Sequence, residues 1–229
     1  MPELWVVRMG RVAYGEALEL QRAIAAARIA GQIPEDVLLL LEHPPVVTLG
    51  RSTKEENVTS PAELLRNKGV EVFEVERGGD VTFHGPGQLV GYPIFDLKRH
   101  RQDVHWFLRE VENSLIRAVA PWGIAAARSG GFTGVWTGPR KIASIGVHVR
   151  DWVTWHGFAL NVNTDLTYFD LIVPCGIPGV VMTSMAKETG RTDIAMRDVE
   201  DAVARAIGDT FSLTAVPTEL VDLRITAVS

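Results

Sequence analysis

Apolar runs of strand length alternate with segments of helical period along this chain, and this alternation restricts its fold more than any other feature. Turn residues bound most of these runs, which is the pattern of β-strands in a sheet. The predicted strands cover residues 4–7, 37–41, 70–75, 89–95, 142–149, 153–162 and 171–173. No repeat, low-complexity tract or long polar linker interrupts the series. We therefore predict one α/β (α+β) domain over residues 1–229, with a mixed central sheet flanked by helices.

Apolar residues at helical spacing predict three helices, near residues 17–27, 104–119 and 199–207. Asp103 is the expected N-cap of the middle helix, and Pro121 is expected to end it. The segment 60–63, Ser-Pro-Ala-Glu, has the pattern of a capping box with proline at the first helical position. A short helix is expected to begin there.

Composition and charge limit the kinds of partner that the chain can have. A net charge of −5 argues against a general nucleic-acid-binding protein, which needs a surplus of Lys and Arg on one face. No stretch reaches the roughly 18 uncharged apolar residues that span a bilayer. Glu3 and Arg8 interrupt the apolar N-terminus, which is unlike a signal peptide. We expect a soluble, cytoplasmic protein that does not bind membranes.

The chain has one cysteine, Cys175, within Leu-Ile-Val-Pro-Cys-Gly-Ile-Pro-Gly. A single thiol forms neither an internal disulfide nor a multi-cysteine metal site, so it is either packed in the core or reactive. A packed structural cysteine is the more common case. The prolines and glycines around Cys175 favour a reactive one, because turns expose side chains rather than bury them. We predict a thiol at the end of strand 171–173.

Lys141 stands at the start of the apolar strand predicted at 142–149, where another apolar residue would be expected. A thiol attacks as its thiolate, which a nearby cation stabilises. Lys141 is a candidate for that cation, although a lysine at a strand end also commonly extends its amine into solvent.

Two further segments have the composition of a ligand site. Five glycines within residues 76–93 let the backbone approach a ligand, and Arg77 and His84 add a charge and a titratable ring. An ordinary hairpin explains this segment equally well, and it lacks the lysine and spacing of a P-loop. Gly157 and Ala159 share one face of the strand 153–162, which suits either an unbranched alkyl chain or a closely packed helix. No spacing of His, Asp and Glu predicts a metal site.

Several segments, in this order along the chain, resemble the lipoyl(octanoyl) transferases, which belong to the biotin/lipoate protein ligase fold. They are Arg-Gly-Gly-Asp-Val-Thr-Phe-His-Gly-Pro-Gly-Gln at 77–88, Lys-Ile-Ala-Ser-Ile-Gly at 141–146, His-Gly-Phe-Ala-Leu-Asn-Val-Asn at 156–163 and Pro-Cys-Gly-Ile at 174–177. The segment 42–50 matches as well, so the resemblance covers roughly residues 36–185. Each motif alone is modest, but the ordered set is specific.

The resemblance implies transfer of an octanoyl group from acyl carrier protein to a lysine, without a cofactor and with no metal. The implied acceptors are lipoyl domains of oxo-acid dehydrogenase E2 subunits and the glycine-cleavage H protein. Cys175 matches the acyl-thioester cysteine, and Lys141 matches the lysine that stabilises its thiolate. The implied substrate-binding residues are Arg77, Gly78, Gly79, Asp80, Val81, Thr82, Phe83, His84, Ser144, Ile145, Gly146, Gly157, Phe158 and Ala159. We expect a monomer.

Three alternatives stay open at this point. An ATP-dependent lipoate or biotin ligase of the same fold would activate a free acid as its adenylate and would not need Cys175. A cysteine hydrolase would release free octanoate, but such enzymes generally pair cysteine with histidine rather than lysine. A non-catalytic module would bind a lipoyl domain or an acyl chain, and it would have no use for Lys141 and Cys175 together.

Overall fold

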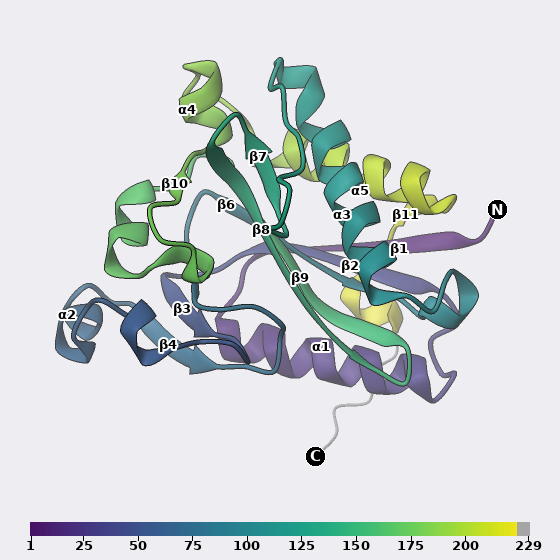
Figure 1. Ribbon diagram of the computed structural model, residues 1–229. Helices are drawn as coiled ribbons and strands as arrows, with labels where there is room; N and C mark the ends of the chain where they lie inside the picture. Colours follow the sequence, from purple (N-terminus) through teal and green to yellow (C-terminus); the bar gives the residue numbers. More distant parts are fainter. Residues whose placement is uncertain (224–229) are drawn as a thin grey trace.

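The computed structural model describes residues 1–223 and contains a large mixed sheet beside a small one (Figure 1). The large sheet has the strand order β10-β8-β9-β6-β2-β1-β11, and β7 pairs with β8. Its strands are β1 Glu3–Arg11, β2 Asp36–Glu42, β6 Gln88–Ile94, β7 Val135–Thr137, β8 Arg140–Arg150, β9 Val153–Asn161, β10 Val181–Met182 and β11 Thr214–Pro217. Strand β1 runs parallel to β2 and β11, and β10 runs parallel to β8, whereas the other pairs are antiparallel. The predicted mixed central sheet is confirmed.

The small sheet has the strand order β4-β3-β5. Its strands are β3 Val46–Leu49, β4 Glu71–Glu74 and β5 Thr82–His84. Strand β4 is parallel to β3, and helix α2 (Ala62–Asn67) lies in the connection between them. The glycine-rich loop, residues 75–81, joins β4 to β5 and faces the large sheet.

Helices cover both faces of the large sheet (Figure 1). Helix α1 (Tyr14–Ile29) packs on one face, and helices α3 (Val104–Val119) and α5 (Met196–Phe211) pack on the other, while α4 (Met185–Thr189) follows β10. Leu38 and Leu40 of β2 point toward α3 and α5, whereas Leu39 and Leu41 point toward α1. A central strand buried on both faces is apolar throughout, which explains the unbroken apolar run of β2. Among residues 1–223, no helix has the length and apolar character needed to cross a bilayer.

The three longer predicted helices are confirmed as α1, α3 and α5. The Asp103 side chain accepts a hydrogen bond from the Trp106 amide and caps α3 as expected. The short helix near residue 61 is present as α2, but the predicted capping box is wrong. Pro61 itself occupies the N-cap position, and no side chain caps the helix.

The predicted strand 171–173 is also wrong. Leu171 ends a 3₁₀ helix (Leu166–Leu171), and residues 172 and 173 join no sheet. Leu171 and Ile172 are buried against Phe83 beneath the small sheet. The apolar character of this segment therefore comes from side-chain packing and not from strand pairing.

Two buried histidines, His43 and His84, lie between the small sheet and helix α1. His43 donates from Nδ1 to the Val12 carbonyl, at 2.7 Å, and its Nε2 accepts from the Tyr92 hydroxyl, at 2.7 Å. Burial lowers the pKa of His43 to about 4, and burial together with the neighbouring His43 lowers the pKa of His84 to about 3. Both rings are therefore neutral in the folded protein at neutral pH.

We predict that the free energy of unfolding falls as the pH drops from about 6.5 toward 4.5. In this range the histidines become protonated in the unfolded chain, whereas His43 and His84 stay neutral in the folded protein. Each such histidine contributes up to about 1.4 kcal/mol per pH unit, and its contribution is fully present above the unfolded pKa of about 6.5. Urea unfolding at several pH values measures this slope. His43→Gln should flatten it, whereas His105→Gln, at an exposed position of α3, should not. An unchanged slope in His43→Gln would contradict the assignment.

Candidate active site

Cys175 lies in a one-turn 3₁₀ segment (Pro174–Gly176) with backbone angles φ 58° and ψ 18°. The thiol is thus in a turn, as the surrounding prolines and glycines indicate, but not at a strand end. Few residues other than glycine adopt this left-handed conformation, and it is enriched at functional sites. The Cys175 side chain is only partly buried.

The glycine-rich loop holds the cysteine turn in place. The Cys175 amide donates to the Val81 carbonyl at 2.8 Å, and the Val173 amide donates to the Asn57 carbonyl at 2.8 Å. Asn57 also donates through its side chain to Asp80 at 2.7 Å. Gly176 has φ 63°, and a Cβ there would collide with the Asp80 carboxylate. The turn therefore lies directly on the loop.

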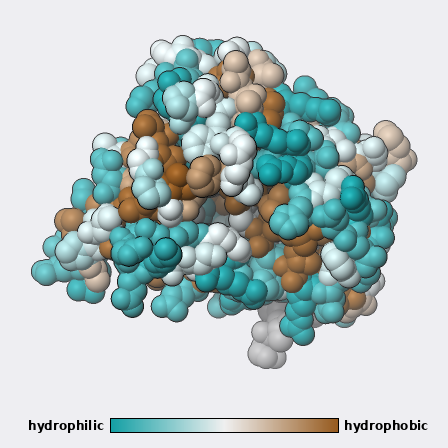
Figure 2. All heavy atoms as spheres, in the orientation of Figure 1, coloured by the Kyte–Doolittle hydropathy of each residue, from teal (hydrophilic) through white to brown (hydrophobic). Residues whose placement is uncertain are grey.

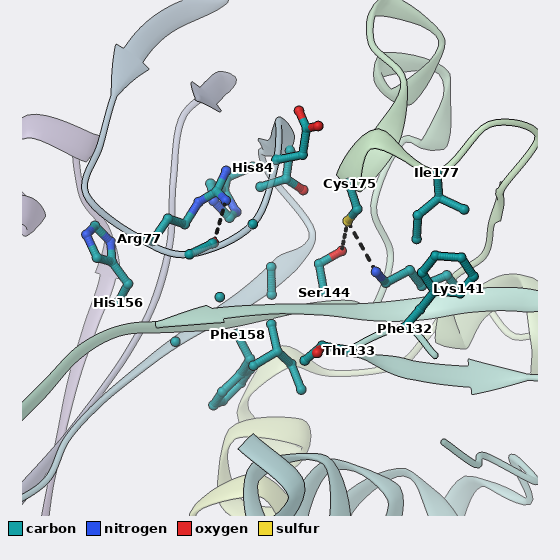
Figure 3. A pocket seen from close by; sticks show the side chains of 18 of the residues that line it. Arg77, His84, Phe132, Thr133, Lys141, Ser144, His156, Phe158, Cys175 and Ile177 are labelled. Atoms are coloured by element: carbon teal, nitrogen blue, oxygen red, sulfur yellow. Dashed lines mark hydrogen bonds between the residues drawn. The ribbon is translucent and has the colours of Figure 1, made fainter. Parts of the chain in front are cut away.

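Lys141 is 1% exposed and extends from the start of β8 toward the thiol (Figure 3). Its Nζ donates to Cys175 Sγ at 3.2 Å, and Ser144 Oγ lies 3.5 Å from the same sulfur. The amine also lies 5.4 Å from the centre of the Trp136 ring. Gly134 packs over the lysine, since a Cβ at that position would lie 2.7 Å from Lys141 Cε. The chain thus holds a buried lysine side chain within hydrogen-bond distance of its one thiol.

A cavity of about 160 Å³ opens beside the thiol, between the large sheet and the glycine-rich loop. In the space-filling view, apolar side chains gather beside a hollow near the middle of this face (Figure 2). Phe132, 47% exposed, lies at the rim with Thr133 and Ile177. Sequence-predicted residues that line the cavity are Arg77, Gly78, Gly79, Asp80, Thr82, His84, Lys141, Ser144, Ile145, Gly146, Gly157, Phe158, Ala159 and Cys175.

Two residues of the predicted set, Val81 and Phe83, do not line the cavity. Both side chains point the other way, into the core beneath the small sheet, where Phe83 stacks on Tyr168. Side chains alternate along a strand, so Thr82 and His84 face the cavity and their neighbours cannot. Val81 still contributes to the site through its carbonyl oxygen.

The glycines of the site matter mainly because they lack a Cβ, which lets neighbouring backbone segments pack closely against them. A Cβ on Gly146 would lie 2.7 Å from the Gly78 carbonyl oxygen, so this glycine lets the loop settle on β8. A Cβ on Gly157 would collide with the Gly91 carbonyl oxygen of the neighbouring strand β6. Gly157 therefore permits the pairing of β6 with β9, while Ala159 supplies the small surface predicted for an alkyl chain.

Sequence reasoning missed six lining residues: Tyr14, Tyr92, Phe132, Thr133, His156 and Ile177. His156 has a φ of 56°, which breaks the alternation of side chains along β9 and turns its ring away from the side on which Phe158 lies (Figure 3). It lies on the α1 side instead, where its amide donates to Gln21 Oε1 at 2.9 Å. Phe132 lies between Gly131 and Gly134 in the sequence. Glycines on both sides of an apolar residue are a sequence pattern that indicates an exposed loop.

The residues at the site have the chemistry that acyl transfer requires. Within residues 1–223, no group of three or more His, Cys, Asp or Glu side chains could hold a metal ion. A thiol beside a buried lysine amine, at a cavity lined by several small residues, can attack a carbonyl carbon and hold an acyl chain as a thioester.

Comparisons with known proteins agree with this chemistry. A model of the lipoyl protein ligase A/B catalytic domain matches residues 13–208. Octanoyltransferases of Acidobacterium capsulatum and Gloeobacter violaceus are 49% and 46% identical, over 90% and 93% of this chain and 89% and 92% of theirs. The octanoyltransferase of Myxococcus xanthus is 50% identical over 92% of this chain, which spans only 60% of that protein.

Solved structures share the fold at low sequence identity. A putative lipoate protein ligase from T. acidophilum has a TM-score of 0.74 at 17% identity and covers 96% of this chain and 90% of its own. A lipoate-protein ligase A bound with ATP has a TM-score of 0.75 at 14% identity and covers 97% and 90%. At these identities the similarity establishes the fold alone.

We predict that Lys141→Met lowers the rate of Cys175 alkylation at pH 7 by about ten-fold or more, because the neutral side chain no longer stabilises the thiolate. Iodoacetamide labelling followed by intact mass measures the rate. Lys98→Met, an exposed lysine, serves as the control and should react like the parent. Parental reactivity in Lys141→Met would exclude the electrostatic role.

Proposed function

The chain belongs to the lipoyl protein ligase A/B catalytic-domain family, and from this premise we propose that Cys175 carries an octanoyl group as a thioester before a protein lysine receives it. Octanoyltransferases are 46% and 49% identical to the chain over most of both lengths. The chain is accordingly an acyltransferase that moves octanoyl groups in protein lipoylation. The contact of Lys141 Nζ with Cys175 Sγ at 3.2 Å is the observation that supports the thioester mechanism.

The first half-reaction exchanges one thioester for another. The Cys175 thiolate attacks the carbonyl carbon of the donor thioester, the donor C–S bond breaks, and the carrier leaves as a thiol after taking a proton from Lys141, which is left as a neutral amine. In the second half-reaction the amine of the acceptor lysine attacks the same carbon. The C–N bond forms, the bond to Cys175 breaks, and Lys141 is placed to receive the proton that the amine loses. Neither step requires a cofactor.

An ATP-dependent ligase is the alternative function, because lipoate protein ligases share this fold. The octanoyltransferases at 46% and 49% identity favour acyl transfer over it. The position of Cys175 beside the cavity also favours transfer, because adenylate chemistry makes no use of a thiol. Exchange of pyrophosphate into ATP that depends on free octanoate would support the ligase instead.

We propose acyl carrier protein as the donor, and lipoyl domains of E2 subunits and the glycine-cleavage H protein as acceptors, with residues 1–229 acting as one catalytic domain. The family supports an acyl donor and a lipoyl-accepting protein in general terms, and these partners would place the reaction in the cytoplasm. Local positive charge would be needed to bind an acidic carrier. Arg128 and Arg140 are ion-paired with Glu112 and Glu188. Arg51 is exposed and lies next to the glycine-rich loop, because its backbone amide donates a hydrogen bond to the Arg77 carbonyl.

We predict that Cys175 acquires one octanoyl group when the protein is mixed with octanoyl-acyl carrier protein. Intact mass shows the adduct, and its transfer to a lipoyl domain removes it. Cys175→Ala should show neither adduct nor transfer. Octanoyl transfer at the parental rate by Cys175→Ala would exclude Cys175 as the nucleophile.

Charge reversal in Arg51→Glu should raise KM for octanoyl-acyl carrier protein several-fold, because the carrier is acidic, and the effect should shrink as salt screens the interaction. Steady-state kinetics at low and high salt measure both effects. Arg150→Glu, at the exposed β8–β9 hairpin, is the matched control and should leave KM unchanged. An unchanged KM in Arg51→Glu would remove Arg51 from the docking surface.

A further inference from the structure

The end of the cavity away from Cys175 is polar. Figure 3 shows Arg77, His84 and His156 on one side of the cavity, and Cys175 and Lys141 on the other. The small residues Gly146, Gly157 and Ala159 line it as well, together with the polar residues Asp80 and Ser144. An acyl chain attached to Cys175 would therefore run past them and point its ω end at Arg77.

Buried polar atoms without a partner collect at this end. Arg77 Nε, Thr82 Oγ1 and His156 Nε2 are fully buried, and none has a hydrogen-bond partner among residues 1–223. All three residues line the cavity. Unpaired buried polar atoms are uncommon in folded proteins and generally bond to water or to a ligand. Three of them around one cavity indicate a place for a polar ligand group.

Arg77 brings an unbalanced charge to this place. Its side chain is 7% exposed and donates to the Gly78 carbonyl, the Thr48 carbonyl and the Thr48 hydroxyl. Within residues 1–223 no carboxylate lies within ion-pair distance of it, and the Asp80 carboxylate, which lines the same cavity, accepts hydrogen bonds from Asn57 and from the Val81 amide. Buried charges in proteins are normally paired. The guanidinium therefore has no carboxylate in direct contact with it, and a ligand carboxylate could supply that contact.

The neighbouring groups are neutral or are paired elsewhere. His84 donates from Nδ1 to Gln88 Oε1 at 2.8 Å, and its lowered pKa keeps it uncharged. Burial raises the pKa of Tyr14 to about 12, so the phenol stays protonated and can donate. Glu76 lies 3.8 Å from His156 but is ion-paired with Arg22 at 2.7 Å. The recess thus holds one guanidinium and several hydrogen-bond donors, while the Asp80 carboxylate lines the same cavity and is held by Asn57 and the Val81 amide.

We propose that this recess, formed by Arg77, Thr82, Tyr14 and His156, binds a carboxylate at the ω end of a medium-chain acyl group. The enzyme would then also transfer half-thioesters of dicarboxylic acids. The inference rests on the acyl transfer proposed above for the Cys175 end. The bonds that form and break at Cys175 are the same as for octanoyl, and the ω-carboxylate takes part only in binding.

The test compares two donors of equal chain length, octanoyl- and suberoyl-acyl carrier protein, in which a carboxylate replaces the terminal methyl. We expect kcat/KM for suberoyl within about ten-fold of that for octanoyl. Thr82→Val keeps the side-chain shape but removes a donor to the carboxylate, so it should lower the suberoyl-to-octanoyl ratio by about ten-fold. Thr210→Val is the matched control, because Thr210 in α5 also has a buried hydroxyl without a partner, far from the cavity. It should leave the ratio unchanged.

Two results would contradict the proposal that the recess binds an ω-carboxylate. One is suberoyl transfer by the parent protein more than about a hundred-fold slower than octanoyl transfer. The other is a Thr82→Val variant with the parental ratio. A ratio is insensitive to partial misfolding, because both donors use the same protein.

Binding without turnover separates this inference from the proposed function. Calorimetry with suberic acid monoamide and with octanamide compares a carboxylate and a methyl end directly, and we expect tighter binding of the carboxylate by about ten-fold. Absence of octanoyl transfer with this preference intact would overturn the proposed function and keep the recess. Octanoyl transfer without a preference for the carboxylate end would overturn the recess and keep the proposed function.

Discussion

The hydrogen bonds of Arg77 are the constraint on which the rest of the site depends. Its guanidinium bonds to Thr48 in the small sheet, while the next amide, of Gly78, donates to the Val147 carbonyl of the large sheet at 2.9 Å. One residue and its neighbour thereby fasten the two sheets together. Side chains at Gly50 or Gly146 would prevent the contact, since each would strike the loop backbone. The cavity exists because these two sheets meet without filling the space between them.

The same loop also determines where the Cys175 thiol lies. From Arg77 it runs to Val81, whose carbonyl holds the Cys175 amide, so one short segment touches both ends of the cavity. Lys141 approaches from the opposite sheet, at the start of β8. The thiol and its cation thus come from different parts of the structure, and their 3.2 Å contact depends on the closure of the loop. This dependence couples packing of the small sheet to reactivity at Cys175.

Much of this arrangement follows from the sequence, and the exceptions have physical reasons. Alternating apolar runs and helical spacing predict the sheet and helices α1, α3 and α5, because burial fixes those periods. The ordered motifs bring Arg77, Lys141, Ser144 and Cys175 together. The wrong strand at 171–173 arose because three apolar residues pack equally well without pairing. Val81 and Phe83 were misplaced because a motif gives order along the chain and not the side of the strand. The orientation of the His156 side chain depends on a positive φ, which no sequence pattern indicates.

The left-handed backbone of Cys175 has a consequence for the history of the molecule. A side chain in this conformation costs about 1–3 kcal/mol relative to what a glycine would experience. A Cys175→Gly variant would therefore have a larger free energy of unfolding but no thiol. Selection for thermal stability alone would favour that glycine, whereas the proposed thioester mechanism requires the cysteine to be retained. Any laboratory evolution of thermostable variants from this scaffold has to screen for acyl transfer at every round.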